Sequence, residues 1–202
     1  MSDPQPLPFL VLPEYVLLPG TLVPFHASEP EPCRLFGAAL ADRRLLVVAS
    51  GAAGSVAALG RIVSDRRYPD GRIDVFVHGL ERVRVTSVEA SPDGPIAHVL
   101  SEPDDGATTT HEAGARLRAV TLALIIVLGE GARAEEGEAL RSVLGSTSEC
   151  GVFANRLGSF VLADFHERQA LLETRCPVTR ADWLTRRVGE TLLEATPNEP
   201  VH

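Results

Sequence analysis

The chain has 202 residues, and its 27 acidic and 19 basic side chains leave a formal net charge of −8. This balance argues against a general binder of nucleic acids or anionic membranes, because such partners are held mainly by an excess of Lys and Arg. The length allows one large domain or two small ones, whose core needs no metal or disulfide to fold. A content of 45% hydrophobic and 23% charged residues is that of an ordinary globular protein.

All 19 basic side chains are arginines, and lysine is absent. A nucleotide-binding P-loop, a Schiff-base enzyme and a Ser-Lys hydrolase each need a lysine amine. The chain therefore supports none of these activities. Biased codon usage explains the missing lysines more simply than a functional reason does. The three activities are excluded with either cause.

Three cysteines, Cys33, Cys150 and Cys176, lie far apart and are odd in number. They form neither a CxxC zinc pair nor a complete disulfide framework, so we expect a reducing, cytoplasmic environment. Residues 1–20 lack a basic segment and are interrupted by prolines and acids, unlike a secretory signal. The longest apolar run, residues 122–128, is far shorter than the roughly 20 residues that span a bilayer.

Short apolar runs separated by Pro and Gly fill residues 7–102. Residues 45–49, LLVVA, have the sequence of a buried strand. Pro69-Asp70-Gly71 is typical of a tight turn, and the apolar residues Ile73, Val75 and Val77 that follow alternate as in a strand with one buried face. We expect this strand to end at Gly79.

The alternation resumes over residues 82–86, and a second Pro-Asp-Gly turn at 92–94 leads into the apolar residues 96–100. One helix is expected near Glu31–Ala41. This half of the chain is therefore predicted to be a compact antiparallel β unit, either a small barrel or a curled sheet.

The composition changes at residues 103–106, and the remainder reads as helical. Thr109 and Glu112 have the spacing of a capping box. Apolar residues recur every three or four positions after it, which predicts an amphipathic helix that ends at Gly129. Residues 129–137 are small and acidic and predict a loop. Further helices are expected at 138–144, 152–162 and 163–173 and around Trp183–Leu192.

No histidine lies in a catalytic or metal-binding pattern. His166-Glu167 begins like the HExxH zinc motif, but Ala170 stands where the second histidine is required. His111 falls at an expected helix start, and His78 and His98 fall on the polar sides of strands. Structural roles explain these positions better than catalysis or metal binding.

Nucleophile and nucleotide motifs are also missing. Ser55 and Ser159 follow glycines, but neither belongs to a GxSxG elbow. The Gly-rich residues 51–60 lack the GxGxxG spacing of a dinucleotide-binding turn and predict a loop between strands. Cys150 at a helix start is a possible reactive thiol, although a buried, inert cysteine is the commoner case. The pattern alone predicts a soluble binding protein with no catalytic residue, cofactor or metal.

Several blocks of the sequence, in their order and spacing, resemble one known family. They lie in residues 7–30, with Leu18-Pro19-Gly20 and Glu29-Pro30, and continue through 59–62, 69–72, 78–85, 153–157 and 167–173. The family is the N-terminal substrate-binding domain of the ATP-dependent Lon protease, which also occurs as free-standing Lon-domain proteins. The resemblance covers residues 7–194, and Arg168 replaces the usual lysine of the family's E-K-Q-x-L-L-E helix.

The chain departs from the family's pattern at two places. Residues 26–33, HASEPEPC, stand where the family usually has Ile-Phe before Glu-Pro and an Arg-Tyr pair after it. Residues 56–60, VAALG, replace the more usual V-G-T-x-A. No P-loop is present, so we expect neither ATPase nor protease activity.

The resemblance implies an α+β fold with a PUA-like pseudo-barrel of antiparallel strands, residues 7–103, followed by a helical bundle, residues 107–195. It also implies recognition of peptides or unfolded protein segments, without catalysis. A structural or assembly protein with a fixed protein partner is the alternative, and an unrecognised hydrolase is a third. PUA-like folds also bind RNA, but a net charge of −8 without a basic block argues against that partner.

The segment Pro24–Pro32 is the predicted binding surface. Its prolines prevent full pairing in a sheet and place it at an edge, where an extended polypeptide can add as a strand. Phe25 and His26 begin the segment and Phe36 follows in the adjacent helix, and these three are the candidate peptide-binding residues. In the alternative explanation, Phe25 and Phe36 fill the barrel core.

Overall fold

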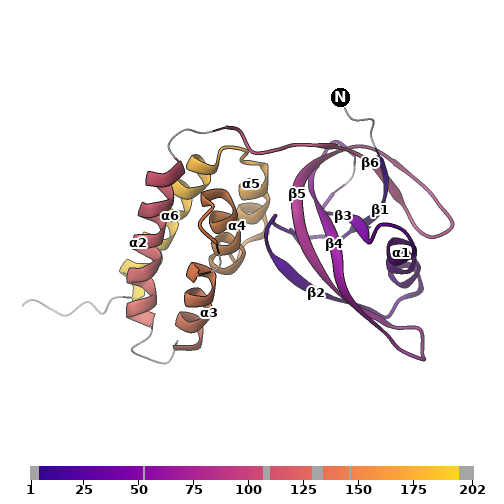
Figure 1. Ribbon diagram of the computed structural model, residues 1–202, viewed down its shortest axis with the longest axis horizontal. Coiled ribbons are helices and arrows are strands. Elements are labelled where there is room, and N and C mark those ends of the chain that lie inside the picture. The colour runs from indigo at the N-terminus through magenta and orange to yellow at the C-terminus, as the bar shows by residue number, and fades with distance from the viewer. Residues whose placement is uncertain (1–4, 52, 107–109, 129–133, 146, 196–202) are drawn as a thin grey trace, which may run out of the picture. The chain divides into compact units, whose positions relative to one another are not determined.

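The computed structural model describes residues 5–51, 53–106, 110–128, 134–145 and 147–195. Its strands are β1 (Gln5–Val11), β2 (Leu22–Ala27), β3 (Leu45–Ala49), β4 (Val56–Arg67), β5 (Ile73–Glu89) and β6 (Ile96–Ser101). Its helices are α1 (Pro30–Ala41), α2 (Thr110–Leu128), α3 (Ala134–Gly145), α4 (Cys150–Val161), α5 (Phe165–Glu173) and α6 (Pro177–Ala195), as Figure 1 shows. The predicted α+β class is confirmed.

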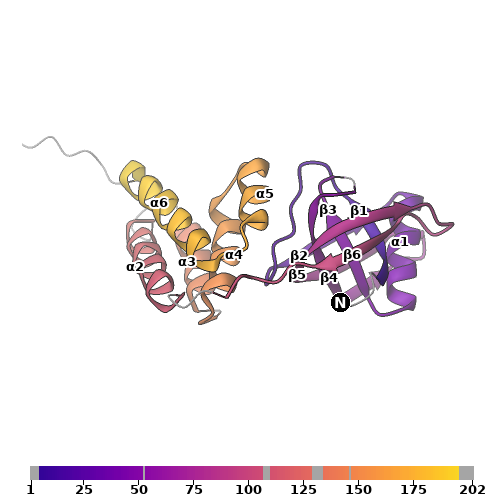
Figure 2. The ribbon, with the colours of Figure 1, turned by 90° about the horizontal axis from the view of Figure 1, so that it is seen from above.

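The contacts divide the chain into two units. Unit 1 contains Met1–Pro103 and Asp164–Glu173, and unit 2 contains Asp104–Ala163 and Thr174–His202. The described strands therefore belong to unit 1 together with α1 and α5, and unit 2 holds α2, α3, α4 and α6 (Figure 2).

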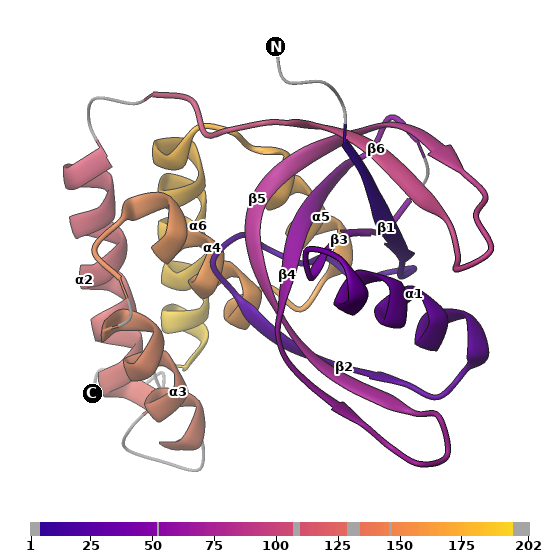
Figure 3. The ribbon, with the colours of Figure 1, turned by 45° about the vertical axis from the view of Figure 1, so that its right-hand side comes forward.

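The sheet of unit 1 closes on itself. Its strand order is β2-β5-β4-β3-β1-β6, and β6 also pairs with β5. The extra pairing joins β5, β4, β3, β1 and β6 into a ring and leaves β2 attached to β5 outside it (Figure 3). This arrangement agrees with the expected barrel, whereas its PUA-like character stays a prediction.

One pairing differs from the expected antiparallel sheet. β1 runs parallel to β3, with Phe9 opposite Val47 and Val11 opposite Ala49. The long connection between these strands contains β2 and α1, and a long connection of this kind is what a parallel pair requires. The sheet is therefore mixed.

The core of unit 1 is made by alternate residues of the strands and by one face of α1. Leu35, Phe36 and Ala39 are the buried residues of α1, and they pack on the strands. A second cluster of buried side chains fills the barrel beside β1 and β6: Leu7, Phe9, Val47, Ala49, Ala57, Val83, Val85 and Ala97.

The turn between β4 and β5 has the predicted geometry. Gly71 has a φ of +91°, the left-handed conformation that the Pro-Asp-Gly sequence favours. Gly71 N donates to the carbonyl of Tyr68 at 3.0 Å, and Tyr68 N donates to the carbonyl of Arg72 at 2.9 Å. The second Pro-Asp-Gly, with Gly94 at a φ of +116°, likewise precedes β6.

Gly79 does not end a strand, so that prediction is wrong. β5 continues through it, with Gly79 opposite Gly60 and Glu81 opposite Leu59, which leaves Leu80 as the extra residue of a bulge. A Cβ at Gly79 would overlap the carbonyl oxygen of Leu18. The glycine is therefore needed for the close approach of another segment and not for a turn.

Unit 2 also differs from the expectation at one helix. Residues 129–137 were expected to form a loop, but α3 begins at Ala134, and 129–133 lie outside the described residues. Glu135 and Glu136 fall in the first turn of α3, where acidic side chains favour a helix start. Thr109 of the predicted capping box also lies outside the described residues.

The segment Asp164–Glu173 groups with the strands, although the sequence placed it in the helical lobe. The amide of Gln169 donates to the carbonyl of Val56 at 3.1 Å, and its carbonyl accepts from Ser50 Oγ at 3.2 Å. Leu171 and Leu172 are buried. These contacts attach α5 to the β4 side of unit 1.

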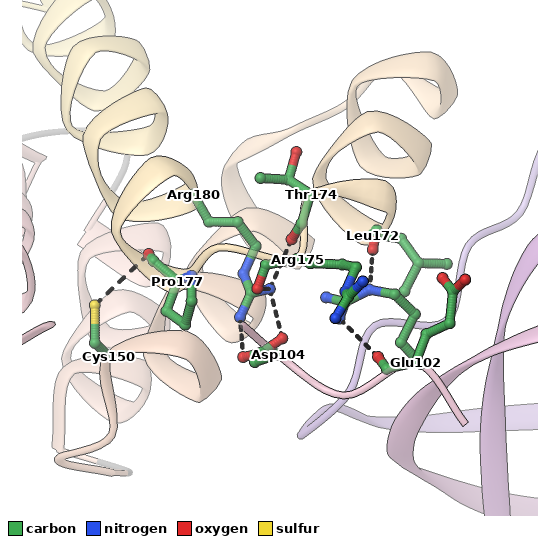
Figure 4. A network of polar contacts seen from close by, with 9 residues as sticks. Glu102, Asp104, Cys150, Leu172, Thr174, Arg175, Pro177 and Arg180 are labelled. Carbon is green, nitrogen blue, oxygen red and sulfur yellow. Dashed lines mark hydrogen bonds and ion pairs between the residues drawn. The ribbon is translucent and has the colours of Figure 1, made fainter. Parts of the chain in front are cut away.

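A buried arginine holds unit 2 together (Figure 4). The Arg180 side chain is 0% exposed and binds both carboxylate oxygens of Asp104, at 2.8 and 2.6 Å. It also donates to the carbonyl of Thr174 at 2.8 Å. A Cβ at Gly151 would overlap this ion pair, so the start of α4 packs closely on it.

We predict that Gly79→Ala lowers the free energy of unfolding by about 1–3 kcal/mol, because the new methyl group overpacks against Leu18. Gly37→Ala is the matched control, since a Cβ there meets nothing within 4 Å in α1. It should stabilise the chain by about 0.5–1 kcal/mol through helix propensity. Urea unfolding of both variants measures the difference, and equal stabilities would contradict the close approach of Leu18 to Gly79.

Candidate functional site

β2 is an edge strand, as its prolines predict. It stands at one end of the sheet order and pairs along one side with β5, from Leu22 opposite His78 to Ala27 opposite Ile73. Gly79 N donates to the carbonyl of Thr21 at 2.9 Å. Because backbone directions alternate in an antiparallel ladder, the backbone groups of Leu22, Pro24 and His26 point away from β5.

The outer face of β2 and β5 carries exposed apolar side chains. Leu22 is 57% exposed, Phe76 is 45% exposed, and Pro24 lies opposite Phe76 and is also exposed. Val63 is exposed in β4 at an irregularity between Ile62, which pairs with Val77, and Ser64, which pairs with Phe76. We call Leu22, Pro24, Val63 and Phe76 the β2 surface. Exposed apolar side chains gathered on one face often mark an interaction site.

A polar cluster lies at one end of the β2 surface. His26 Nδ1 is hydrogen-bonded to Asp74 Oδ1, and Tyr68 Oη donates to Asp74 Oδ2 at 2.6 Å. The guanidinium groups of Arg66 and Arg72 each lie 5.0 Å from the centroid of the Tyr68 ring, within the range of cation–π attraction. The cluster connects β2 to β5 and to the β4–β5 turn.

These contacts change the acidity of two side chains. The hydrogen bond from Tyr68, followed by that from His26, holds the pKa of Asp74 below its ordinary value of 3.8. The same bond to Asp74, followed by desolvation, raises the pKa of Tyr68 above its ordinary value. Both effects follow because the hydrogen bond favours ionised Asp74 and the protonated tyrosine.

The structure separates the three predicted site residues. Phe36 is 2% exposed and lies in the core of unit 1, which agrees with the alternative explanation for this residue. Phe25 is half-buried, and its ring centroid lies 5.5 Å from that of Tyr15 and 6.4 Å from that of Phe36. His26 is exposed, on the opposite face of β2.

Sequence reasoning missed the apolar part of the β2 surface. Phe76 occupies a position where the alternation of Ile73, Val75 and Val77 predicts an outward, polar side chain. A large aromatic residue at an outward-facing position of a strand is the sequence signal that could have identified Phe76. Val63 gave no such signal, because its direction depends on the irregularity in β4.

A cavity of about 540 Å³ in unit 2 is a weaker candidate site than the β2 surface. It is lined by Arg118 and Cys150 among others, but Arg118 donates to the carbonyls of Leu144 and Thr147. Burial raises the pKa of the Cys150 thiol, which disfavours the reactive thiolate. Within the described ranges, no three His, Cys, Asp or Glu side chains are grouped to hold a metal ion.

Comparison with known proteins identifies the family. The profile described as the ATP-dependent protease La (LON) substrate-binding domain matches residues 6–188. The chain belongs to the Lon substrate-binding domain family. No helix in the described part of this Lon-family chain is long and apolar enough to cross a membrane.

Its relatives include Lon proteases. The chain is 28% identical to a Lon protease of Solibacter usitatus and 25% identical to one of Desulfatibacillum aliphaticivorans. The matches cover 95% and 89% of this chain but 24% and 23% of the two relatives. The chain thus spans about a quarter of the length of these proteases.

Solved structures share the fold. The N-terminal domain of the Mycobacterium avium complex Lon protease matches with a TM-score of 0.70 and 20% identity, over 92% of this chain and 99% of that one. A Lon N-terminal domain protein from Xanthomonas campestris matches with a TM-score of 0.62 and 20% identity, over 96% of this chain and 99% of that one. The α+β architecture is therefore that of Lon N-terminal domains.

Phe36 and Phe76 carry the same side chain, but truncating each to alanine is expected to change the stability of the chain differently. Phe36→Ala should lower the free energy of unfolding by about 3–5 kcal/mol, because it removes a buried ring from the core. Phe76→Ala should change it by less than about 1 kcal/mol, because its ring lies on the outer face. Chemical denaturation monitored by circular dichroism measures both, and similar losses for the two variants would contradict the placement of Phe76.

The stabilising contribution of Asp74 should depend on pH. Its pKa is lowered in the folded chain, so its ionised form adds stability above the ordinary carboxyl pKa, and that stability is lost as the pH falls through the lower, folded-state pKa. The melting temperature of Asp74→Asn should therefore lie below that of the wild type at neutral pH and approach it as the pH falls below about 3.8.

Asp93→Asn, in the exposed turn before β6, serves as the control and should match the wild type at neutral pH. Thermal melts of the three proteins across this pH range make the comparison. A difference for Asp74→Asn that stays constant with pH would mean that the carboxylate charge plays no part.

Proposed function

We propose that the chain is a non-catalytic module that binds extended or unfolded polypeptide segments at the edge of β2. One observation supports this proposal most: β2 has outward backbone groups on its free side and exposed apolar side chains on its outer face. The first can pair with an extended backbone, and the second can cover apolar side chains of the ligand. Membership of the Lon substrate-binding domain family supports the same proposal.

Binding at this edge would depend only weakly on the sequence of the ligand. Leu22 and His26 offer a backbone N–H and C=O each, whereas Pro24 offers a carbonyl alone because proline lacks an N–H. A short extended segment would add to β2 through these groups, whatever its sequence. Phe76 and Leu22 would favour ligands with apolar side chains, since burial of apolar surface contributes about 25 cal/mol per Å².

We propose no catalytic activity for this chain, and the ATPase and protease mechanisms that need lysine are impossible in it. Lysine is absent from the sequence, which removes the amine that P-loops and Ser-Lys proteases require. We propose polypeptides as the partners, since the net charge of −8 argues against nucleic acids and anionic membranes. We further propose a reducing compartment such as the cytoplasm, because Cys33, Cys150 and Cys176 are free thiols.

Binding of a permanently unfolded, fluorescently labelled polypeptide tests the proposal. Phe76→Ala is expected to weaken binding about tenfold, as truncation of an aromatic anchor does at other interfaces, while leaving the melting temperature nearly unchanged. Leu22→Asp should weaken it further, by placing a charge beside the apolar ligand.

Leu100→Ala is the matched control, because Leu100 is 44% exposed but lies on β6. It should bind like the wild type. Wild-type protein that fails to bind the polypeptide, or β2-surface variants that bind as well as Leu100→Ala, would reject the β2 edge as the site. A single stoichiometric partner recovered in place of unfolded chains would favour the assembly role.

A further inference from the structure

Three neighbouring strands of unit 1 present one continuous outer face. β5 pairs with β2 on one side and with β4 on the other. Residues directly opposite each other in antiparallel strands point to the same face, so each row of paired residues crosses all three strands. The row at one end contains Leu22, His78 and Arg61, the row at the other end contains His26, Asp74 and Arg66, and the row between them holds part of the β2 surface.

An arginine lies at each end of the β4 side of this face. Arg61, Val63 and Arg66 are all exposed on β4. At about 3.3 Å per residue, Arg61 lies about 7 Å from Val63 along the strand, and Arg66 lies about 10 Å from it on the other side. A ligand that covers Val63 of the β2 surface therefore has a guanidinium group on either side of it.

Neither of these arginines is bonded to a carboxylate of the described residues. The side chain of Arg61 forms no hydrogen bond or ion pair with any of them. The guanidinium of Arg66 lies over the Tyr68 ring at 5.0 Å, and the carboxylate in its row, Asp74, is already bonded to Tyr68 and His26. Both guanidinium groups therefore keep N–H donors for a ligand.

The acidic side chains nearby do not cancel this charge. Asp74 is the only carboxylate in the three rows, which contain two arginines. The other acids of the β4–β5 hairpin are paired elsewhere, Asp65 with Arg44 at 2.7 Å and Asp70 with Arg72 at 2.7 Å. The outer face is therefore positive, although the whole chain carries a net charge of −8.

We propose that the β2 surface selects polypeptides in which acidic residues flank an apolar segment. This inference rests on the proposed function and names the ligands that the surface prefers. Leu22, Val63 and Phe76 contact the apolar segment, and Arg61 and Arg66 attract carboxylates on either side of it. Basic residues at the same positions of the ligand would meet like charges, which disfavours binding.

The net charge of the chain makes the opposite prediction, so the two can be separated. A charge of −8 attracts basic ligands over long distances. At about 0.15 M salt the screening length is about 8 Å, so distant acids are largely screened whereas the arginines beside Val63 are not. The local charges should therefore decide the preference at this salt concentration.

Labelled peptides of one length test the preference by fluorescence anisotropy at about 0.15 M salt. Each carries the same core of leucine and phenylalanine, flanked on both sides by glutamate, glutamine or lysine. The Glu-flanked peptide should bind about fivefold more tightly than the Gln-flanked one, because two exposed ion pairs together contribute about this factor. The Lys-flanked peptide should bind most weakly. A fourth peptide, with glutamate flanks and a serine core, should lose about tenfold or more in affinity because it buries no apolar side chain.

Arg61→Gln and Arg66→Gln locate the preference. Each should lower the advantage of Glu flanks over Gln flanks about twofold, and the double variant should abolish it. Arg61→Gln is the decisive variant, because its side chain has no contact of this kind to lose within the described residues. Arg34→Gln is the matched control, since Arg34 is an exposed arginine of α1 in the same unit but outside the three rows. It should keep the full preference, and melting temperatures check that every variant is folded.

The outcomes separate this inference from the proposed function. Equal affinities of the Glu-, Gln- and Lys-flanked peptides, with all three weakened by Phe76→Ala, would overturn the inference and leave the proposed function intact. A Glu preference that Arg61→Gln and Arg66→Gln leave unchanged would also overturn it, as would a serine-core peptide that binds as tightly as its apolar parent. A wild-type chain that binds none of the peptides would reject both proposals.

Discussion

The fold of unit 1 depends on a change of partner along one edge of β5. Residues 73–78 pair with β2, and residues 83–89 pair with β6. The change falls at Gly79, Leu80 and Glu81, where the bulge bends the strand and the turn at Leu18 packs against a glycine that has no side chain to exclude it. Because β6 takes over the edge, the barrel closes without β2. The candidate binding edge is thus a consequence of the closure.

The same part of β5 fixes the chain where it leaves the barrel. Arg82 is buried and donates to the carbonyls of Leu172 and Glu102, at the ends of α5 and β6. In unit 2, Arg180 binds Asp104 and the carbonyl of Thr174. Arg82 therefore fixes the backbone at Glu102 and Leu172 in unit 1, and Arg180 fixes Asp104 and the backbone at Thr174 in unit 2. Burying a guanidinium is costly unless its donors are paired, which explains why these sites are built from carbonyls and one carboxylate. In Arg180 they pair the two terminal nitrogens, whereas the buried Nε has no hydrogen-bond partner among the described residues.

Local patterns in the sequence were sufficient for β3, the first half of β5, both Pro-Asp-Gly turns and the β2 edge. The loop predicted for residues 51–60 is wrong, because residues 56–60 begin β4 and pair with both β3 and β5. Local patterns failed where a distant segment decides. Gly79 looks like a strand end because its contact with Leu18 is invisible in the sequence, and α5 looks like part of the helical lobe because its hydrogen bonds to Ser50 and Val56 lie more than 100 residues away. Phe36 is an aromatic residue of the kind that anchors a ligand, but it lies in the core. Only the packing of the fold distinguishes a core phenylalanine from a surface anchor. Phe76 is the opposite example, because it lies in a strand but is exposed.

Polypeptide binding at β2 uses the outward backbone groups of a strand edge in unit 1. Every extended segment carries matching N–H and C=O groups, so the proposed binding depends weakly on the sequence of the ligand. The exposed Leu22 and Phe76 would add a preference for apolar side chains, which folded proteins mostly bury and unfolded chains expose. The two contributions together would favour unfolded chains over folded proteins.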